Sequence, residues 1–68
     1  MPAHVRDALE SRRLMSAYEA RPPYQQNDYL GWIARAKREE TRQRRLDQML
    51  AELEDGSTYM KMRWNGPR

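Results

Sequence analysis

Apolar side chains recur at helical spacing in several stretches of this chain. In the first stretch Val5, Ala8 and Leu9 stand at i, i+3 and i+4, which is one face of a short helix. Pro2 fits the first turn of such a helix, because the amide hydrogen that proline lacks has no partner there in any case. This pattern predicts a helix over residues 2–10.

A second apolar group follows closely, made of Leu14, Met15 and Tyr18. Ser11 precedes it and is a suitable N-cap, since its hydroxyl can accept a hydrogen bond from a free amide of the first turn. The group predicts a helix over residues 12–20. Periodicity leaves open whether the first two segments are separate helices or one bent helix.

Two prolines separate this segment from a third helix. The residue before a proline is driven out of the helical region, so Pro22 ends the second segment and Pro23 can open the next, over residues 23–37. Gly31 lies inside it at a cost of up to about 1 kcal/mol, which a close approach of another helix would explain. Its apolar face, at i, i+3, i+4 and i+7, consists of Tyr29, Trp32, Ile33 and Ala36.

A fourth helix is predicted over residues 39–55, ended by Gly56 as a favourable C′ residue. No large apolar side chain falls in residues 37–45, and burial of both flanking stripes favours a turn near residues 38–40. The sequence therefore predicts an all-α fold, a small bundle of three to four short helices. Its expected core residues are Tyr18, Tyr29, Trp32, Ile33, Ala36, Leu46, Met49, Leu50 and Leu53.

The helical domain is expected to cover residues 1–56, with a loosely ordered tail over residues 57–68. In this tail apolar and basic residues alternate with period two, which is typical of an extended segment, although one strand alone is not stable. We expect the tail to lie extended over the helices or to stay flexible. The alternating residues are Tyr59, Met60, Lys61, Met62, Arg63 and Trp64.

The composition predicts a thin and adaptable core. The 68 residues include five Met and no Phe, so self-association or packing on a partner is expected.

The composition also argues against catalysis. The chain has no Cys and a single histidine, His4, which rules out disulfides and thiolate metal sites and leaves no nucleophile–base pair. We therefore expect no enzyme activity, no cofactor and no metal ion.

No apolar run approaches the roughly 18 residues that a membrane span requires. The first residues lack the order of a secretory signal, a charged start followed by an apolar stretch. A cytoplasmic protein is the expectation from these two observations.

Charge is segregated around the predicted fourth helix. Residues 35–45 hold six cationic side chains against two glutamates, whereas residues 46–55 hold four acidic side chains and no cationic one. This order opposes the helix macrodipole, which favours acids at the start and bases at the end. The arginines therefore have another use. They either pair within the fold (Arg42 and Arg45 with carboxylates of neighbouring helices, or Arg45 with a backbone carbonyl) or bind an anionic partner.

A longer spaced pattern runs through the middle of the chain. Its residues are Tyr18, Pro22, Pro23, Tyr29, Trp32, Ile33, Ala36, Lys37, Thr41, Arg42, Arg45 and Gly56. In these positions the chain resembles the bacteriocin-protection family, also called the YdeI or OmpD-associated family. The resemblance implies a helical C-terminal module, often appended to another domain. It also implies a link to bacteriocin or cationic-peptide resistance and to an outer-membrane porin, in relatives that include exported proteins. Arg21 departs from the family, because an apolar residue is usual there.

These observations together predict a non-catalytic helical interaction module that binds another protein or itself. The alternative is a nucleic-acid-binding protein similar to helix-turn-helix proteins, which would use the basic segment 35–45. The candidate partner-binding residues are Arg38, Arg42, Arg44, Arg45, Tyr59, Met62 and Trp64.

Overall fold

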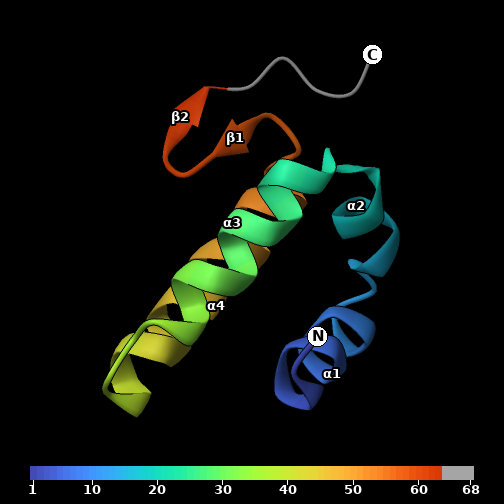
Figure 1. Cartoon of the computed structure of the whole chain (residues 1–68). Coiled ribbons are helices and arrows are strands. Elements are labelled where there is room, and N and C mark those ends of the chain that lie inside the picture. Colours follow the sequence, from blue (N-terminus) through green and yellow to red (C-terminus); the bar gives the residue numbers. More distant parts are fainter. Residues whose placement is uncertain (64–68) are drawn as a thin grey trace.

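The computed structural model describes residues 1–63, and within them the chain forms four α-helices followed by a small β-hairpin (Figure 1). The predicted all-α bundle is confirmed, with the hairpin as an addition. The elements are α1 (Ala3–Ser11), α2 (Met15–Ala20), α3 (Pro23–Ala34), α4 (Glu39–Asp55), β1 (Thr58–Tyr59) and β2 (Met62–Arg63).

Helices α1 and α2 are separate, and a left-handed residue divides them. Arg13 has a φ of 58°, and the amide of Leu14 donates to the carbonyl of Leu9 at 2.8 Å. The amide of Arg13 donates to the carbonyl of Glu10 at 3.1 Å, which completes the Schellman arrangement of a helix C-terminus. Leu9 and Leu14 are both buried in the core, so this helix end is held by an apolar contact as well. Helix α2 consequently begins three residues later than the sequence predicts.

The turn between α3 and α4 starts earlier than expected. Helix α3 ends at Ala34, not at residue 37, and the amide of Ala36 donates to the carbonyl of Ile33 at 3.2 Å. The backbone at Arg38 is extended, with φ −103° and ψ 146°, so α4 begins directly after it. At the other end of α4, Gly56 has a φ of 80° and donates its amide to the carbonyl of Glu52 at 2.9 Å.

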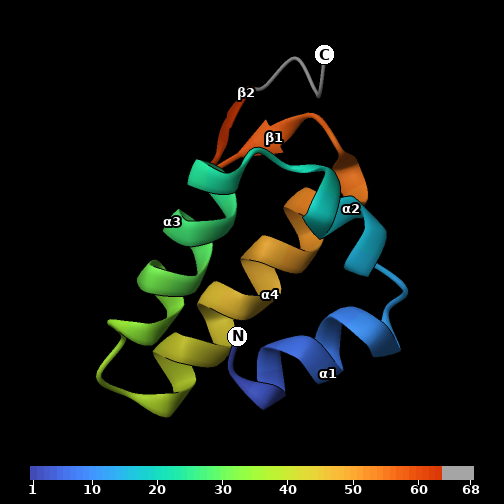
Figure 2. The ribbon, with the colours of Figure 1, turned by 45° about the vertical axis from the view of Figure 1, so that its right-hand side comes forward.

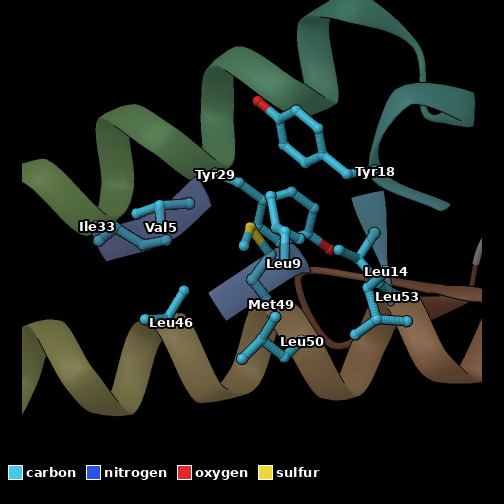
Figure 3. Packing of buried hydrophobic residues seen from close by; sticks show 10 residues of the cluster. All are labelled: Val5, Leu9, Leu14, Tyr18, Tyr29, Ile33, Leu46, Met49, Leu50 and Leu53. Atoms are coloured by element: carbon cyan, nitrogen blue, oxygen red, sulfur yellow. The ribbon is translucent and has the colours of Figure 1, made fainter. Parts of the chain in front are cut away.

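The core lies between the pair α3 and α4 and the first two helices. Helices α3 and α4 run antiparallel beside each other, and α1 and α2 lie along one side of this pair (Figure 2). Side chains of α1 reach between those of α3 and α4 (Figure 3). The buried cluster consists of Val5, Leu9, Leu14, Tyr18, Tyr29, Ile33, Leu46, Met49, Leu50 and Leu53.

Two expectations for α3 need correction. Trp32 is half-buried at the edge of the core, whereas Ile33 and Ala36 are buried with the other expected core residues. A Cβ added at Gly31 would meet only the guanidinium of Arg35, at 3.3 Å, so no other helix approaches this glycine. Trp32 stays outside because it stands one position away from the row of Tyr29 and Ile33, on the side where Arg45 covers it.

Candidate functional site

The predicted partner-binding residues fall at opposite ends of α4. Arg38 precedes the first residue of this helix, whereas Tyr59 and Met62 belong to the hairpin that follows its last turn (Figure 1). A helix of 17 residues is about 25 Å long, so the two groups do not form one surface. Trp64 lies outside the described residues.

One of the basic residues serves the fold itself. The Nη1 atom of Arg45 donates to the backbone carbonyl of Trp32 at 2.6 Å, and its guanidinium lies 5.2 Å from the centroid of the indole ring. Arg45 thereby ties α4 to α3 at the corner. Of the two partners expected for Arg45 within the fold, the backbone carbonyl is confirmed, and within residues 1–63 Arg45 forms no ion pair with a carboxylate of a neighbouring helix.

The other arginines are spread around α4. Successive helical residues are rotated by about 100°, so Arg42 and Arg44 point to nearly opposite sides. Arg44 is exposed, and Arg38 is exposed and forms an ion pair with Glu40 at 3.7 Å. Arg42 is half-buried and lines an open depression of about 210 Å³, together with His4, Glu39 and Gln43. These cations do not form one continuous basic face.

The chemistry needed for a metal centre is not assembled in the part of the chain that the structure describes. Residues 1–63 contain no group of three or more histidine, aspartate or glutamate side chains placed to hold a metal ion. Within the same residues no helix is both long enough and apolar enough to cross a bilayer. The remaining candidate site is the hairpin together with the side chains that anchor it to the helices.

A buried polar cluster that the apolar spacing of the sequence does not reveal lies beneath the hairpin. Arg21, Gln25 and Glu52 are 3%, 0% and 5% exposed. The Nη1 atom of Arg21 donates to Oε1 of Gln25 at 3.1 Å and to the carbonyl of Thr58 at 2.8 Å, and Nη2 donates to the carbonyl of Glu52 at 2.9 Å. One guanidinium therefore joins the start of α3, the end of α4 and strand β1.

The carboxylate of Glu52 holds the hairpin turn. Its Oε1 atom accepts the amide of Met60 at 2.8 Å, and its Oε2 atom accepts the amide of Lys61 at 2.9 Å. It also accepts the hydroxyl of Tyr29 and, at 3.1 Å, the side-chain amide of Gln48. Burial, followed by this bond to Glu52, raises the pKa of Tyr29, so the phenol stays protonated as a donor.

This carboxylate explains how the turn forms without glycine. Met60 and Lys61 have φ values of 50° and 64°, the backbone of a type I′ turn, in which Asn-Gly is the usual pair. Each residue other than glycine costs about 1–2 kcal/mol in this left-handed region. Hydrogen bonds to a charged acceptor contribute about 1.5–3 kcal/mol each, so the two bonds to Glu52 offset the strain.

The position of the buried cluster was visible in the spacing. Arg21 and Gln25 continue the i+4 row of Tyr29 and Ile33 towards the start of α3, and Glu52 stands three residues after the buried Met49. A search for apolar periodicity passes over such positions, because it counts only apolar side chains. Polar residues within an apolar row were the available signal.

The hairpin surface is the name we use for Tyr24, Tyr59 and Met62. Tyr24 and Met62 are 56% and 61% exposed. The ring of Tyr59 meets those of Tyr24 and Tyr29 edge to face, with centroids 6.0 and 5.5 Å apart. Tyr59 and Met62 are direct partners in the hairpin, so their side chains share one face of it. The surface thus combines an anchored aromatic ring with two exposed apolar side chains.

The link from α4 into the hairpin is also tied down. Asp55 accepts hydrogen bonds from the hydroxyl of Thr58 at 2.6 Å, the hydroxyl of Ser57 at 2.9 Å and the amide of Ser57 at 3.2 Å. These bonds, that of Thr58 first, hold the pKa of the Asp55 carboxyl below its usual value. On the other side of the hairpin, the hydroxyl of Tyr59 donates to Asp28 of α3. The hairpin is therefore fixed to α3 and α4 at several points.

The contact between Tyr59 and Asp28 predicts a loss of stability in alkali. Burial first, and then the bond to Asp28, raise the pKa of Tyr59 from 10.0 to about 12. The folded state holds this proton more tightly, so the stability it provides is complete below pH 10 and is lost as pH rises through about 12. In Asp28→Asn we expect this pKa to move towards 10, measured by resonance titration of isotope-labelled tyrosine.

The matched control for this titration is Asp7→Asn, which removes an exposed carboxylate from α1, away from the hairpin. This variant should leave the Tyr59 titration unchanged. An unchanged pKa of Tyr59 in Asp28→Asn would show that Asp28 does not hold the phenol.

Comparison with known proteins identifies the family of this chain. No curated protein and no solved structure matches the chain. A family model matches residues 1–56, which include all four helices and Gly56, the residue after α4. This range covers most of the chain and contains the spaced pattern from Tyr18 onward. The chain therefore belongs to the bacteriocin-protection family, described as YdeI or OmpD-associated.

Proposed function

We propose that this chain is a non-catalytic helical module that binds a partner protein through the hairpin surface. The observation that carries the proposal is the exposure of Tyr24 and Met62 beside the anchored ring of Tyr59. Aromatic and methionine side chains are enriched at protein interfaces, because they offer large apolar contact area. The description of the family suggests that the partner acts in protection against bacteriocins.

Rigid support of the hairpin surface favours its use in binding a partner protein. Tyr59 is held by its hydroxyl on Asp28, and the turn beside it is held by the carboxylate of Glu52. A surface fixed before binding loses less conformational entropy when it meets its partner. Met62, an unbranched side chain, can adapt to the shape of the partner.

The family match supports a division of roles within the chain. It ends at Gly56, and the hairpin follows it. We infer that the four helices form the body common to the family, and that the hairpin gives this member its choice of partner. The buried Arg21 fits this division, because its guanidinium binds the carbonyl of Thr58 in β1 and so joins the hairpin to the helices.

The test compares a variant in the hairpin with a variant near the start of α4. It measures how strongly each binds the proteins that are purified together with the unchanged chain from its source cells. Met62→Asp places a charge on the hairpin surface and is expected to weaken binding at least about tenfold, as truncation of an interface hot spot does. Arg44→Ala is the control, because this exposed side chain lies near the other end of α4. It should bind as the unchanged chain does.

Circular dichroism is to establish first that both variants stay folded. Equal binding by Met62→Asp and the unchanged chain would overturn the proposal. Binding lost in Arg44→Ala alone would move the partner site to the start of α4.

Nucleic-acid binding has less support, because Arg42, Arg44 and Arg45 do not share one face of α4. A titration of the isotope-labelled chain with duplex DNA distinguishes nucleic-acid binding from protein binding. Resonance shifts that disappear steeply with added salt would favour nucleic acid. Absence of shifts is the expected result.

A further inference from the structure

The second strand of the hairpin has an outer edge able to pair with another strand. β1 and β2 are joined by a two-residue turn, and Tyr59 and Met62 form the pair next to it. In such a hairpin this first pair exchanges its hydrogen bonds, and the groups of the next pair point outward. That next pair is Thr58 and Arg63, and the carbonyl of Thr58 indeed meets Arg21.

The backbone amide and carbonyl of Arg63 lie on the opposite edge of the hairpin from the carbonyl of Thr58. By the same register its amide and carbonyl point away from β1, and β2 is the outermost element of residues 1–63 (Figures 1 and 2). One donor and one acceptor on a single residue complete one hydrogen-bonded pair of an antiparallel ladder. This edge therefore provides a starting point for strand addition.

Building on the function proposed above, we propose that β2 takes up an extended acidic segment of the partner protein as a third strand. The residue of that segment opposite Arg63 is acidic, and its neighbour opposite Met62 is apolar. Side chains alternate between the two faces of a strand, so the recognised segment alternates acidic and apolar residues.

Charge distribution around the hairpin supports an acidic occupant. Lys61 and Arg63 are both exposed, and residues 56–63 contain no acidic side chain. The nearest carboxylates are engaged, because Glu52 accepts the amides of the turn, Asp55 accepts bonds from the start of the hairpin and Asp28 accepts the hydroxyl of Tyr59. An acidic strand would therefore meet two exposed cations, and the carboxylates near them are already hydrogen-bonded within the fold.

The same charges disfavour a second copy of this chain as the occupant. Two β2 strands paired with each other would bring Lys61 and Arg63 of both copies together, and like charges placed opposite each other in a sheet are destabilising. A dimer formed through this edge would be opposed at low salt, where charge repulsion is least screened.

Defined peptides test the proposal on the full chain. The probe is a short synthetic peptide that alternates glutamate and valine. One control has the same residues in two blocks, and a second has lysine in place of glutamate. We expect the alternating acidic peptide to shift the amide resonance of Arg63 and to slow its hydrogen exchange. Neither control should do so.

A charge exchange checks the register. In Arg63→Glu the preference should reverse, with the lysine–valine peptide bound on the order of fivefold more tightly than the glutamate–valine peptide. Arg44→Glu changes the net charge equally at the other end of α4 and should leave the preference for the acidic peptide unchanged. Equal reversal by Arg44→Glu would mean that the peptide responds only to net charge, and the proposal would be wrong.

The outcomes also separate this inference from the proposed function. If no peptide binds while Met62→Asp still abolishes binding of the partner protein, the hairpin surface stands and strand addition is rejected. If the alternating peptide binds at Arg63 but Met62→Asp leaves partner binding intact, the edge is a strand acceptor and the proposed function fails.

Discussion

Glu52→Gln is expected to lower the free energy of unfolding by about 3 kcal/mol, one of the two largest effects we expect in this chain. The two carboxylate oxygens accept the amides of Met60 and Lys61 separately. A glutamine has one oxygen, so in either orientation its NH₂ group faces a backbone N–H. One bond to a charged acceptor is lost and two donors are brought together. Urea denaturation followed by circular dichroism measures the effect.

The control for this variant is Glu54→Gln, two residues away in α4 and exposed. Exposed substitutions of this kind usually change stability by less than about 0.5 kcal/mol. A Glu52→Gln variant as stable as Glu54→Gln would contradict the anchoring role of Glu52. Resonances of the hairpin give a second measurement, because the turn at Met60 should lose its fixed conformation even where the helices persist.

Tyr29→Ala is expected to cost about 3–5 kcal/mol, the range for removal of a large buried aromatic side chain. Tyr29 is 0% exposed, and its ring lies between the core and Tyr59. Its hydroxyl also donates to Glu52. The substitution removes both contacts at once, and a domain of this size has little stability to spare. Thermal and urea unfolding are the measurements.

Trp32→Ala supplies the comparison, because the two residues stand three positions apart in the same helix. The half-buried indole loses contact with the core edge and with Arg45, for which about 1–2 kcal/mol is expected. Stability losses in the reverse order would mean that Trp32, and not Tyr29, fills the centre of the core.

Local patterns were sufficient for the helices and insufficient for the start of α2 and the end of α3. Apolar spacing located the four helical segments, and Gly56 marked the end of α4 because glycine is favoured in the left-handed region. The sequence left the break between α1 and α2 open, because Arg13 occupies the same backbone region without being glycine. This break is stabilised by two backbone hydrogen bonds and by the burial of Leu9 and Leu14, which no local composition signal reveals.

The hairpin escaped detection for a related reason. Sequence rules expect Asn-Gly or a similar pair at a two-residue turn, and here Met60 and Lys61 take that place. Their backbone is stabilised by Glu52, which is eight residues before Met60 and on a different element. Alternation along the tail did point to an extended segment and to Tyr59 and Met62, whereas the burial of Arg21 depends on contacts that form only in the folded chain.

The position of Glu52 couples the hairpin to the helices thermodynamically. Its carboxylate bonds to Tyr29 in the core and to the turn of the hairpin, so loosening one weakens the other. A partner that binds only the intact hairpin therefore shifts the folding equilibrium of all four helices by mass action. At a partner concentration of about 100 times the Kd this shift is about 2.7 kcal/mol. For so small a domain, the amount of partner in the cell would then help to set how much of the chain is folded and how long it survives.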